Sequence, residues 1–173
     1  NSLIAQALTE FRGVKRRFSK TGEVNGVTII DDYGHHPVEI EAALQAARDC
    51  TRGSIIAVFQ PHRYTRLKDL FDDFCTCFND ADHVLVADVY SAGEEPISGM
   101  NKETLVDGLT ACGHRNVRAL DTPRNLARDL CQFVKSGDTV MCLGAGDITQ
   151  WAASLPDQMT SIKNVNGDLK DEQ

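Results

Sequence analysis

The sequence predicts an α/β fold with an open, mostly parallel sheet, helices on both of its faces and one antiparallel edge strand. From residue 54 onward, short apolar runs alternate with helical patterns at intervals of about 25 to 35 residues, which is typical of strands joined by crossover helices. The apolar runs are continuous and rich in β-branched residues, as expected of parallel strands covered on both faces. Near the N-terminus, the turn dipeptide Asn25-Gly26 separates two extended segments and predicts the antiparallel pair.

The first third of the chain is expected to hold two helices that flank this extended pair. The first helix has an apolar stripe formed by Leu3, Ile4, Ala7, Leu8 and Phe11. Residues 16–20 and 27–31 are the extended segments, and residues 21–26 form the turn between them. A proline at position 37 suits the first turn of the second helix, whose apolar stripe is Ile40, Ala43, Leu44 and Ala47.

The remaining elements alternate up to residue 154. Strands are predicted at residues 54–59, 84–87, 117–120 and 139–143. A long amphipathic helix is predicted from the stripe Leu67, Leu70, Phe71, Phe74, Cys75 and Phe78. Further helices are predicted at residues 102–112 (weakened by Gly108), from Thr122-Pro123 through Val134, and at residues 148–154. We therefore expect one domain over residues 1–155 and a polar, frayed tail over residues 156–173.

Composition excludes several classes of function. The 173 residues carry a net charge of −7, which argues against nucleic acid or an anionic membrane as the main partner. No apolar run approaches the roughly 20 residues of a membrane span, and the N-terminus lacks the pattern of a signal peptide. The six cysteines form no Cys-x-x-Cys pair, and no histidine lies at zinc-ligand spacing from them. We expect buried reduced thiols, no metal site and a cytoplasmic protein.

Polar motifs follow four of the predicted strands. They are DDYGHHP at residues 31–37, QPHRYTR at residues 60–66, DVYSAGEE at residues 88–95 and GAGD at residues 144–147. Ligands of open α/β sheets bind outside the carboxyl ends of the strands, so these loops are expected to share one edge and one site. Because the sequence has no Gly-x-x-x-x-Gly-Lys-Ser/Thr loop to cradle ATP phosphates, we interpret the loops as half of a site for an anionic ligand.

Single residues in these loops have both functional and structural interpretations. Arg63 and Arg66 lie three apart at a helix start, where they either grip a carboxylate or phosphate or remain surface charges. The position of Tyr33 between a carboxylate and a glycine favours a ligand contact, whereas His36 before a proline is interpreted as a helix N-cap. The Gly-Ala-Gly turn at residues 144–146 resembles an anion-binding turn, but no third glycine completes a dinucleotide fingerprint.

Taken together, the four motifs resemble the C-terminal domain of the Mur ligase family and occur in that family's order. The opening residues 4–18 resemble the start of that domain, so the resemblance covers about residues 4 to 155. It implies a Rossmann-like, mostly parallel sheet with one antiparallel strand. It also implies a three-domain, ATP-dependent, amide-forming ligase of peptidoglycan synthesis, of which this chain is the third domain. We expect this domain to be inactive as an isolated fragment.

Within the family, the motifs closely resemble the members that join L-alanine to UDP-N-acetylmuramate through an acyl phosphate. By this resemblance, Arg17 helps to hold the ATP phosphates, and Asp32 holds the ribose of the nucleotide. The other cations of the run Arg12, Lys15, Arg16, Arg17 and Lys20 are interpreted as a solvated face. The resemblance places the Mg²⁺ ligands and the UDP-sugar site in the other two domains.

The L-alanine pocket is implied in the same way. Tyr33, His35, Arg63 and Arg66 shape it, with the arginines facing the carboxylate because a planar guanidinium matches a carboxylate bidentately. His62 is a further candidate for this pocket. Arg17 and His35 are the candidate catalytic residues.

Three competing interpretations remain open. The first is the equivalent domain of murein peptide ligase, although that enzyme has Phe-Ala-His-His where this chain has Tyr-Gly-His-His at residues 33–36. The second is a stand-alone nucleotide-binding or dinucleotide-dependent domain, suggested by the turn at residues 144–146 and disfavoured because no acidic residue ends a following strand. The third is a regulatory module that binds an amino acid.

Overall fold

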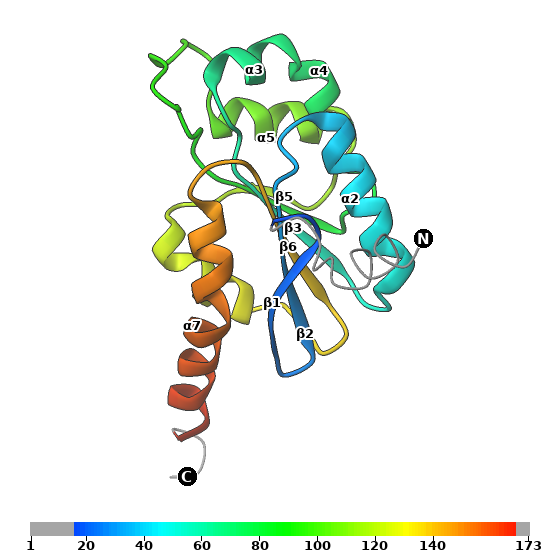
Figure 1. Cartoon of the computed structure of the whole chain (residues 1–173), viewed down its shortest axis with the longest axis vertical. Helices are drawn as coiled ribbons and strands as arrows, with labels where there is room; N and C mark the ends of the chain where they lie inside the picture. Colours follow the sequence, from blue (N-terminus) through cyan, green and yellow to red (C-terminus); the bar gives the residue numbers. More distant parts are fainter. Residues whose placement is uncertain (1–15, 169–173) are drawn as a thin grey trace, which may run out of the picture.

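The computed structural model describes residues 16–168, which are built around one six-stranded sheet (Figure 1). The strands are β1 (Ser19–Val24), β2 (Val27–Asp32), β3 (Ile55–Phe59), β4 (His83–Val86), β5 (Val117–Ala119) and β6 (Thr139–Leu143). Their order is β1-β2-β6-β3-β4-β5; β1 pairs antiparallel with β2, and the other neighbouring pairs are parallel. The predicted sheet with one antiparallel edge strand is therefore confirmed. The helix predicted over residues 3–11 lies outside the described residues.

The β1–β2 hairpin has a two-residue turn. Asn25 and Gly26 have φ angles of 51° and 78°, the left-handed conformation that tight hairpin turns require. Val24 pairs with Val27 across this turn, so the expected six-residue turn is wrong and most of it belongs to β1. The Asn-Gly dipeptide marks the turn itself, but it carries no signal for how far the strand before it extends.

Helices cover both faces of the sheet (Figure 1). One face carries α2 (Pro37–Cys50), α3 (Tyr64–Asp69), α4 (Phe71–Phe74) and α5 (Lys102–Ala111). The other carries α6 (Leu126–Cys131), preceded by the 3₁₀ turn η1 (Pro123–Asn125), and α7 (Ile148–Asp168). Strand β3 connects the two layers, because its successive side chains point to opposite faces. Ile55, Ala57 and Phe59 join one apolar layer, and Ile56 and Val58 join the other.

The long helix predicted over residues 67–78 is broken in two. Leu70, between α3 and α4, has φ −119° and ψ 24°, which is outside the helical region. The apolar stripe is kept across the break, because the rings of Phe74 and Phe78 lie 5.5 and 5.2 Å from the ring of Phe59. Packing against the sheet therefore decides the path of the chain here, over the continuous helical pattern.

Helix α7 continues beyond the start of the expected tail and ends at Asp168. Leu155 and Met159 are buried, and Ile162 packs against the same apolar layer. Their spacing continues one helical stripe, while the polar residues between them occupy the exposed side. Over residues 156–168 the chain is therefore helical where the sequence analysis expects fraying.

Some of the cysteine thiols are buried and others are exposed. Cys75, Cys77 and Cys142 are buried, and burial raises the pKa of Cys75 to about 11 and that of Cys142 to about 12, so both stay protonated at neutral pH. Cys50 and Cys112 are exposed, and the expectation of buried thiols is wrong for them. Among residues 16–168, no helix combines the length and the apolarity needed to cross a membrane.

Helix α5 packs so closely on the end of α4 that Gly108 has no room for a side chain. A Cβ atom there would lie 2.5 Å from Cys75 Sγ and 2.9 Å from Phe71 Cζ. Gly108→Ala gains up to about 1 kcal/mol of helix propensity but overpacks this contact at a cost of about 1–3 kcal/mol. We expect a lower free energy of unfolding in urea, with Asp107→Ala on the exposed side of α5 as the unaffected control. A variant as stable as the parent chain would contradict this packing.

Candidate functional site

Four parallel strands bring the polar loops to one edge of the sheet. The last pairs in the ladders are Asp32 with Leu143, Leu143 with Phe59, and Phe59 with Val86. The loops that follow β2, β3, β4 and β6 therefore leave the sheet on the same side. This confirms the shared edge that the sequence predicts and brings together the candidate residues of the first two loops.

Four aromatic rings cross this edge, and we call them the ring row: Tyr33, His35, His62 and Tyr90. Tyr33 and His35 meet edge-on with their centroids 5.1 Å apart, and His35 lies 5.7 Å from His62. His62 stacks on Tyr90 at 5.5 Å with 15° between the ring planes. The ring row thus joins the loops after β2, β3 and β4 through side chains. No sequence pattern predicts a role for Tyr90, because its partner His62 comes from a different loop.

The two histidines of the ring row present opposite hydrogen-bonding groups. His62 Nδ1 lies 3.1 Å from Arg66 Nη1, and because a guanidinium only donates, Nδ1 accepts and Nε2 carries the proton. Burial, followed by the charge of Arg66, lowers the pKa of His62 and keeps this ring neutral at pH 7. His35 Nδ1 donates to the Tyr33 carbonyl oxygen at 3.0 Å, and in the tautomer that makes this bond Nε2 is an acceptor.

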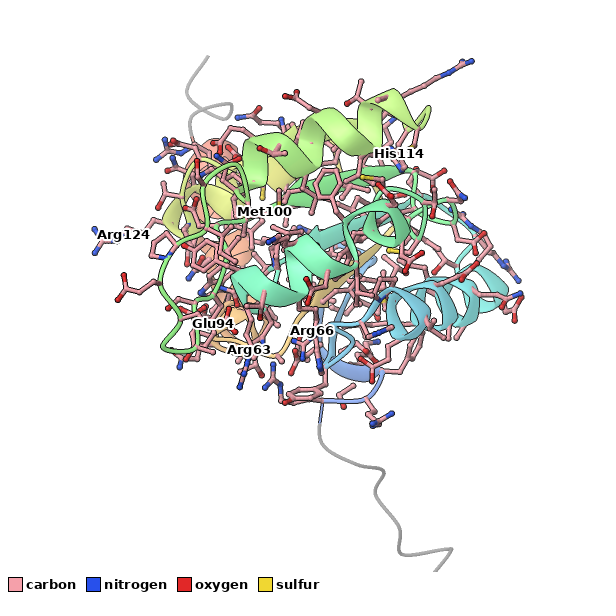
Figure 2. All side chains as sticks on the ribbon, turned by 90° about the horizontal axis from the view of Figure 1, so that it is seen from above. Arg63, Arg66, Glu94, Met100, His114 and Arg124 are labelled. Carbon is pink, nitrogen blue, oxygen red and sulfur yellow. The ribbon has the colours of Figure 1, made fainter. Side chains whose placement is uncertain are left out.

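Arg63 and Arg66 both reach this edge but have different partners. Arg66 donates a second hydrogen bond to the His62 carbonyl oxygen at 3.0 Å, so its guanidinium holds the ring row. Arg63 has a φ of 73°, and its backbone N–H donates to the Tyr90 carbonyl oxygen at 2.8 Å. Its side chain is 50% exposed, and Nη1 lies 3.9 Å from Glu94 Oε1. Figure 2 shows Arg63 and Glu94 next to each other. Arg63 therefore has the more available guanidinium of the two.

Glu94 connects the loop after β4 to the start of α3. Its carboxylate accepts hydrogen bonds from the Thr65 N–H at 3.0 Å and from the Thr65 hydroxyl at 2.7 Å. These bonds, with a smaller contribution from the charge of Arg63, lower the pKa of Glu94. The sequence gives no signal for this contact, because Glu94 and Thr65 lie 29 residues apart and on different loops.

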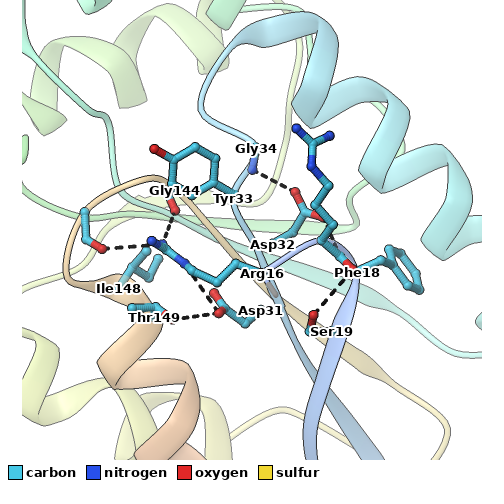
Figure 3. Close-up of polar contacts among 12 residues, drawn as sticks. Arg16, Phe18, Ser19, Asp31, Asp32, Tyr33, Gly34, Gly144, Ile148 and Thr149 are labelled. Carbon is cyan, nitrogen blue, oxygen red and sulfur yellow. Dashed lines mark hydrogen bonds and ion pairs between the residues drawn. The ribbon is translucent and has the colours of Figure 1, made fainter. Parts of the chain in front are cut away.

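A groove of about 440 Å³ opens beside Asp32, and Arg17 lies on its rim. On the α2 side, the groove has an apolar stretch formed by Val38, Ala42, Ala43 and Ala46, and Glu39 of the same helix also lines it. The Asp32 carboxylate accepts the backbone N–H groups of Phe18 and Gly34, each at 2.7 Å, which fixes its orientation (Figure 3). The groove thus combines an apolar wall, an oriented carboxylate and an exposed guanidinium. It brings together the two residues that the resemblance assigns to the nucleotide.

Two backbone amides in and just after the turn at residues 144–146 bind the protein's own groups. The Gly144 N–H donates to the Asp32 carbonyl oxygen at 3.1 Å, and the Ile148 N–H donates to Gln60 Oε1 at 3.2 Å. Arg16 donates to the Gly144 carbonyl oxygen at 2.7 Å. These two amides are therefore not presented to an anion, and the expected anion-binding turn stays a prediction for the amides of Ala145 and Gly146. Arg16 is also a departure from the expected solvated face, because its side chain points into the molecule.

His36 is the N-cap residue of α2, as the sequence predicts. The Glu39 carboxylate accepts the backbone N–H groups of His35 and His36 at 3.1 and 3.2 Å, which satisfies donors at the start of the helix. His36 is therefore structural, and the same carboxylate holds the backbone of His35 in the ring row. Within residues 16–168, no group of three or more His, Cys, Asp or Glu side chains is arranged to hold a metal ion.

Comparison with known proteins agrees with this geometry. The family model "Mur ligase, glutamate ligase domain" matches residues 16–146. The chain is 63% identical over 158 residues to a UDP-N-acetylmuramate–L-alanine ligase of Methylobacterium radiotolerans, covering 91% of this chain and 34% of that protein. It is 57% identical over 164 residues to the same-named ligase of Rhodospirillum centenum, covering 95% of this chain and 34% of that protein. The chain thus spans about a third of the length of the curated relatives it matches.

Solved structures share the fold. The UDP-N-acetylmuramate–alanine ligase of Thermotoga maritima superposes with a TM-score of 0.71 at 30% identity, covering 90% of this chain and 32% of that one. A murein peptide ligase from Psychrobacter arcticus gives a TM-score of 0.69 at 21% identity, covering 89% of this chain and 32% of that one, and shows the fold alone. The family match covers most of the chain, and the fold and the motif-bearing loops agree with it. The chain therefore belongs to the Mur ligase family, in which it forms the glutamate ligase domain.

Proposed function

We propose that this chain is the amino-acid-presenting domain of an ATP-dependent ligase that joins L-alanine to UDP-N-acetylmuramate. The observation that carries this proposal is the arrangement at one sheet edge. The available guanidinium of Arg63 lies beside the ring row, and the groove with Asp32 and Arg17 lies next to its Tyr33 end. One edge therefore offers a carboxylate-binding half and a nucleotide-binding half. The high identity to ligases of that name supports the same substrates.

The amino-acid half suits both ends of L-alanine. The guanidinium of Arg63 accommodates the carboxylate, and Nε2–H of His62 is a further donor beside it. Nε2 of His35 is an acceptor, which suits the amino group and gives His35 its proposed catalytic role as the proton acceptor. Tyr33 closes the pocket edge-on against His35. Arg66 acts by fixing His62.

The nucleotide half suits ATP. An apolar wall of alanines accommodates a flat base, the oriented Asp32 carboxylate accepts ribose hydroxyl groups, and Arg17 on the rim reaches phosphate oxygens. By the family resemblance, the Mg²⁺ that ATP chemistry requires and the UDP-sugar are both proposed to bind in other parts of the full-length protein.

The proposed reaction has two steps. ATP phosphorylates the muramate carboxylate to an acyl phosphate and releases ADP. The L-alanine amine then attacks the acyl carbon, and the amide forms as phosphate leaves. In this scheme Arg17 also has a catalytic role, because a cation beside the transferring phosphoryl group stabilises the charge that develops there.

The experiment uses the full-length protein that contains this chain. ADP release and product mass are measured with ATP, Mg²⁺ and UDP-N-acetylmuramate, and with L-alanine, L-glutamate or a murein tripeptide as acceptor. We expect a product with L-alanine and none with the other two. A product with the tripeptide alone would support the murein peptide ligase function, and no ATP turnover with any acceptor would contradict the proposal.

The chain alone is expected to have no ligase or ATPase activity. It has no phosphate loop for ATP, and the UDP-sugar is proposed to bind elsewhere in the full-length protein. Phosphate release from ATP, Mg²⁺, UDP-N-acetylmuramate and L-alanine should equal the rate without protein. Turnover that disappears in Asp32→Ala would contradict this prediction, because it would come from the chain itself.

A further inference from the structure

We propose that Arg16 is a positioning residue for the amino-acid pocket: it holds Tyr33 and the turn at residues 144–146 in the relative arrangement that L-alanine binding needs. The inference rests on the proposed function, because L-alanine is the ligand proposed there. The inference assigns different roles to the adjacent residues Arg16 and Arg17. Arg16 acts on the amino-acid half of the site, whereas Arg17 belongs to the nucleotide half.

The guanidinium of Arg16 bridges two loops that follow neighbouring strands. Its Nη2 atom donates to the Gly144 carbonyl oxygen at 2.7 Å and lies 3.4 Å from the Gly146 carbonyl oxygen, in the loop after β6. Its central carbon lies 4.8 Å from the ring centroid of Tyr33, in the loop after β2 (Figure 3). A planar guanidinium can stack on a ring and donate in its own plane at once, which the ammonium of lysine cannot do.

Asp31 holds this guanidinium in the interior. Asp31 Oδ2 lies 3.6 Å from Arg16 Nε and accepts a 2.7 Å hydrogen bond from the Thr149 hydroxyl. The side chains of Arg16 and Asp31 are only 24% and 6% exposed, so solvent screens their attraction less than it would at the surface. Arg16 is therefore committed to partners within the domain, and it acts on a substrate through the groups it holds.

The backbone of Arg16 adds a second contact to the same tyrosine. The Tyr33 N–H donates to the Arg16 carbonyl oxygen at 2.6 Å. Arg16 has a φ of 66° and Phe18 a φ of 46°, a left-handed conformation that residues with a Cβ keep only where their surroundings fix it. The Phe18 N–H is held by the Asp32 carboxylate at 2.7 Å. The chain before β1 is thus locked to the loop that carries the Tyr33 end of the ring row.

The test compares four variants of the full-length protein. Arg16→Ala should raise the KM for L-alanine about tenfold and leave the KM for ATP nearly unchanged, because small misplacements of binding groups have effects of this size or larger. Arg17→Ala should do the reverse. Arg16→Lys keeps a charge opposite Asp31 but lacks the planar fork, so it should restore only part of the L-alanine KM.

Arg48→Ala is the matched control. Arg48 also bridges two carbonyl oxygens and a carboxylate, those of Asp80, Gly53 and Asp82, but it does so before β3 and β4, at the opposite edge of the sheet. It should lower the thermal unfolding temperature as Arg16→Ala does and leave both KM values unchanged. If Arg16→Ala fails to fold, Arg16→Lys is measured in its place, and its KM for L-alanine should rise about threefold.

The outcomes separate the inference from the function on which it rests. A wild-type protein that turns over ATP with L-alanine, together with an unchanged L-alanine KM in both Arg16 variants, would overturn the positioning role alone. The same result would follow if Arg48→Ala raised the L-alanine KM as much as Arg16→Ala, since the effect would then reflect general loosening. A wild-type protein without L-alanine-dependent turnover would overturn the proposed function and this inference with it.

Discussion

Arg63→Ala in the full-length protein should raise the KM for L-alanine far more than the KM for ATP. The Arg63 guanidinium is half exposed beside the ring row, and among residues 16–168 its one ion pair is the 3.9 Å contact with Glu94, so it is available to a carboxylate. Hydrogen bonds to charged groups contribute about 1.5–3 kcal/mol, which corresponds to a loss of about tenfold to hundredfold in kcat/KM. Steady-state kinetics with each substrate varied in turn measures the two KM values.

Two further variants make this result specific. Arg63→Lys should recover only part of the loss, because an ammonium cannot form the two parallel hydrogen bonds of a guanidinium. Lys68→Ala removes an exposed cation from α3, the helix that Arg63 caps, and should leave both KM values unchanged. An unchanged L-alanine KM with a raised ATP KM in Arg63→Ala would move this arginine to the nucleotide half of the site.

Asp32→Asn should weaken ATP binding and stability together. The carboxylate accepts two backbone N–H groups at 2.7 Å and borders the groove, whereas an asparagine amide turns an N–H₂ group toward one of these donors. Loss of one charge-assisted hydrogen bond lowers the free energy of unfolding by about 1.5–3 kcal/mol. The KM for ATP should rise at least about tenfold, measured by ADP release at saturating L-alanine.

The control for this variant is a carboxylate that lies outside the site. Asp69 is exposed at the end of α3, and Asp69→Asn should change neither the urea midpoint nor the KM for ATP. If Asp32→Asn unfolds at the parent midpoint, the two hydrogen bonds to its carboxylate do not stabilise the fold as described. If its KM for ATP is unchanged, the groove is not the nucleotide half of the site.

The sheet and its polar edge could be predicted because their signals are local. A continuous run such as residues 139–143 identifies a strand by itself, and β6 has these same bounds. The motif after each strand then falls at one edge by the geometry of parallel strands alone. For this reason the residues expected around L-alanine, in particular His35 and His62, are neighbours in the structure.

The errors in the fold arise where distant packing overrides a local pattern. The stripe over residues 67–78 fits one helix, but Leu70 leaves the helical conformation while both halves pack on β3. The polar composition after residue 155 conceals the stripe of Met159 and Ile162, which is visible only when the spacing is followed from Leu155. In both regions the burial of a few apolar side chains decides the structure.

The division of labour within the site could not be predicted from spacing. Arg16 and Arg17 are adjacent cations, and only the structure shows that one points inward and the other lies exposed on the rim of the groove. The partner that holds Arg16 is Gly144, 128 residues away. The contact of Glu94 with Thr65 could not be predicted for the same reason, since it joins two loops that follow different strands.

A crystal structure of the full-length protein with UDP-N-acetylmuramate, L-alanine and a non-hydrolysable ATP analogue tests the central claim most directly. We expect the L-alanine carboxylate within hydrogen-bond distance of the Arg63 guanidinium, its amino group near His35 Nε2, and the ribose against Asp32. L-alanine bound by other domains, with the ring row facing solvent, would contradict the assignment of this sheet edge as the amino-acid-presenting half of the site.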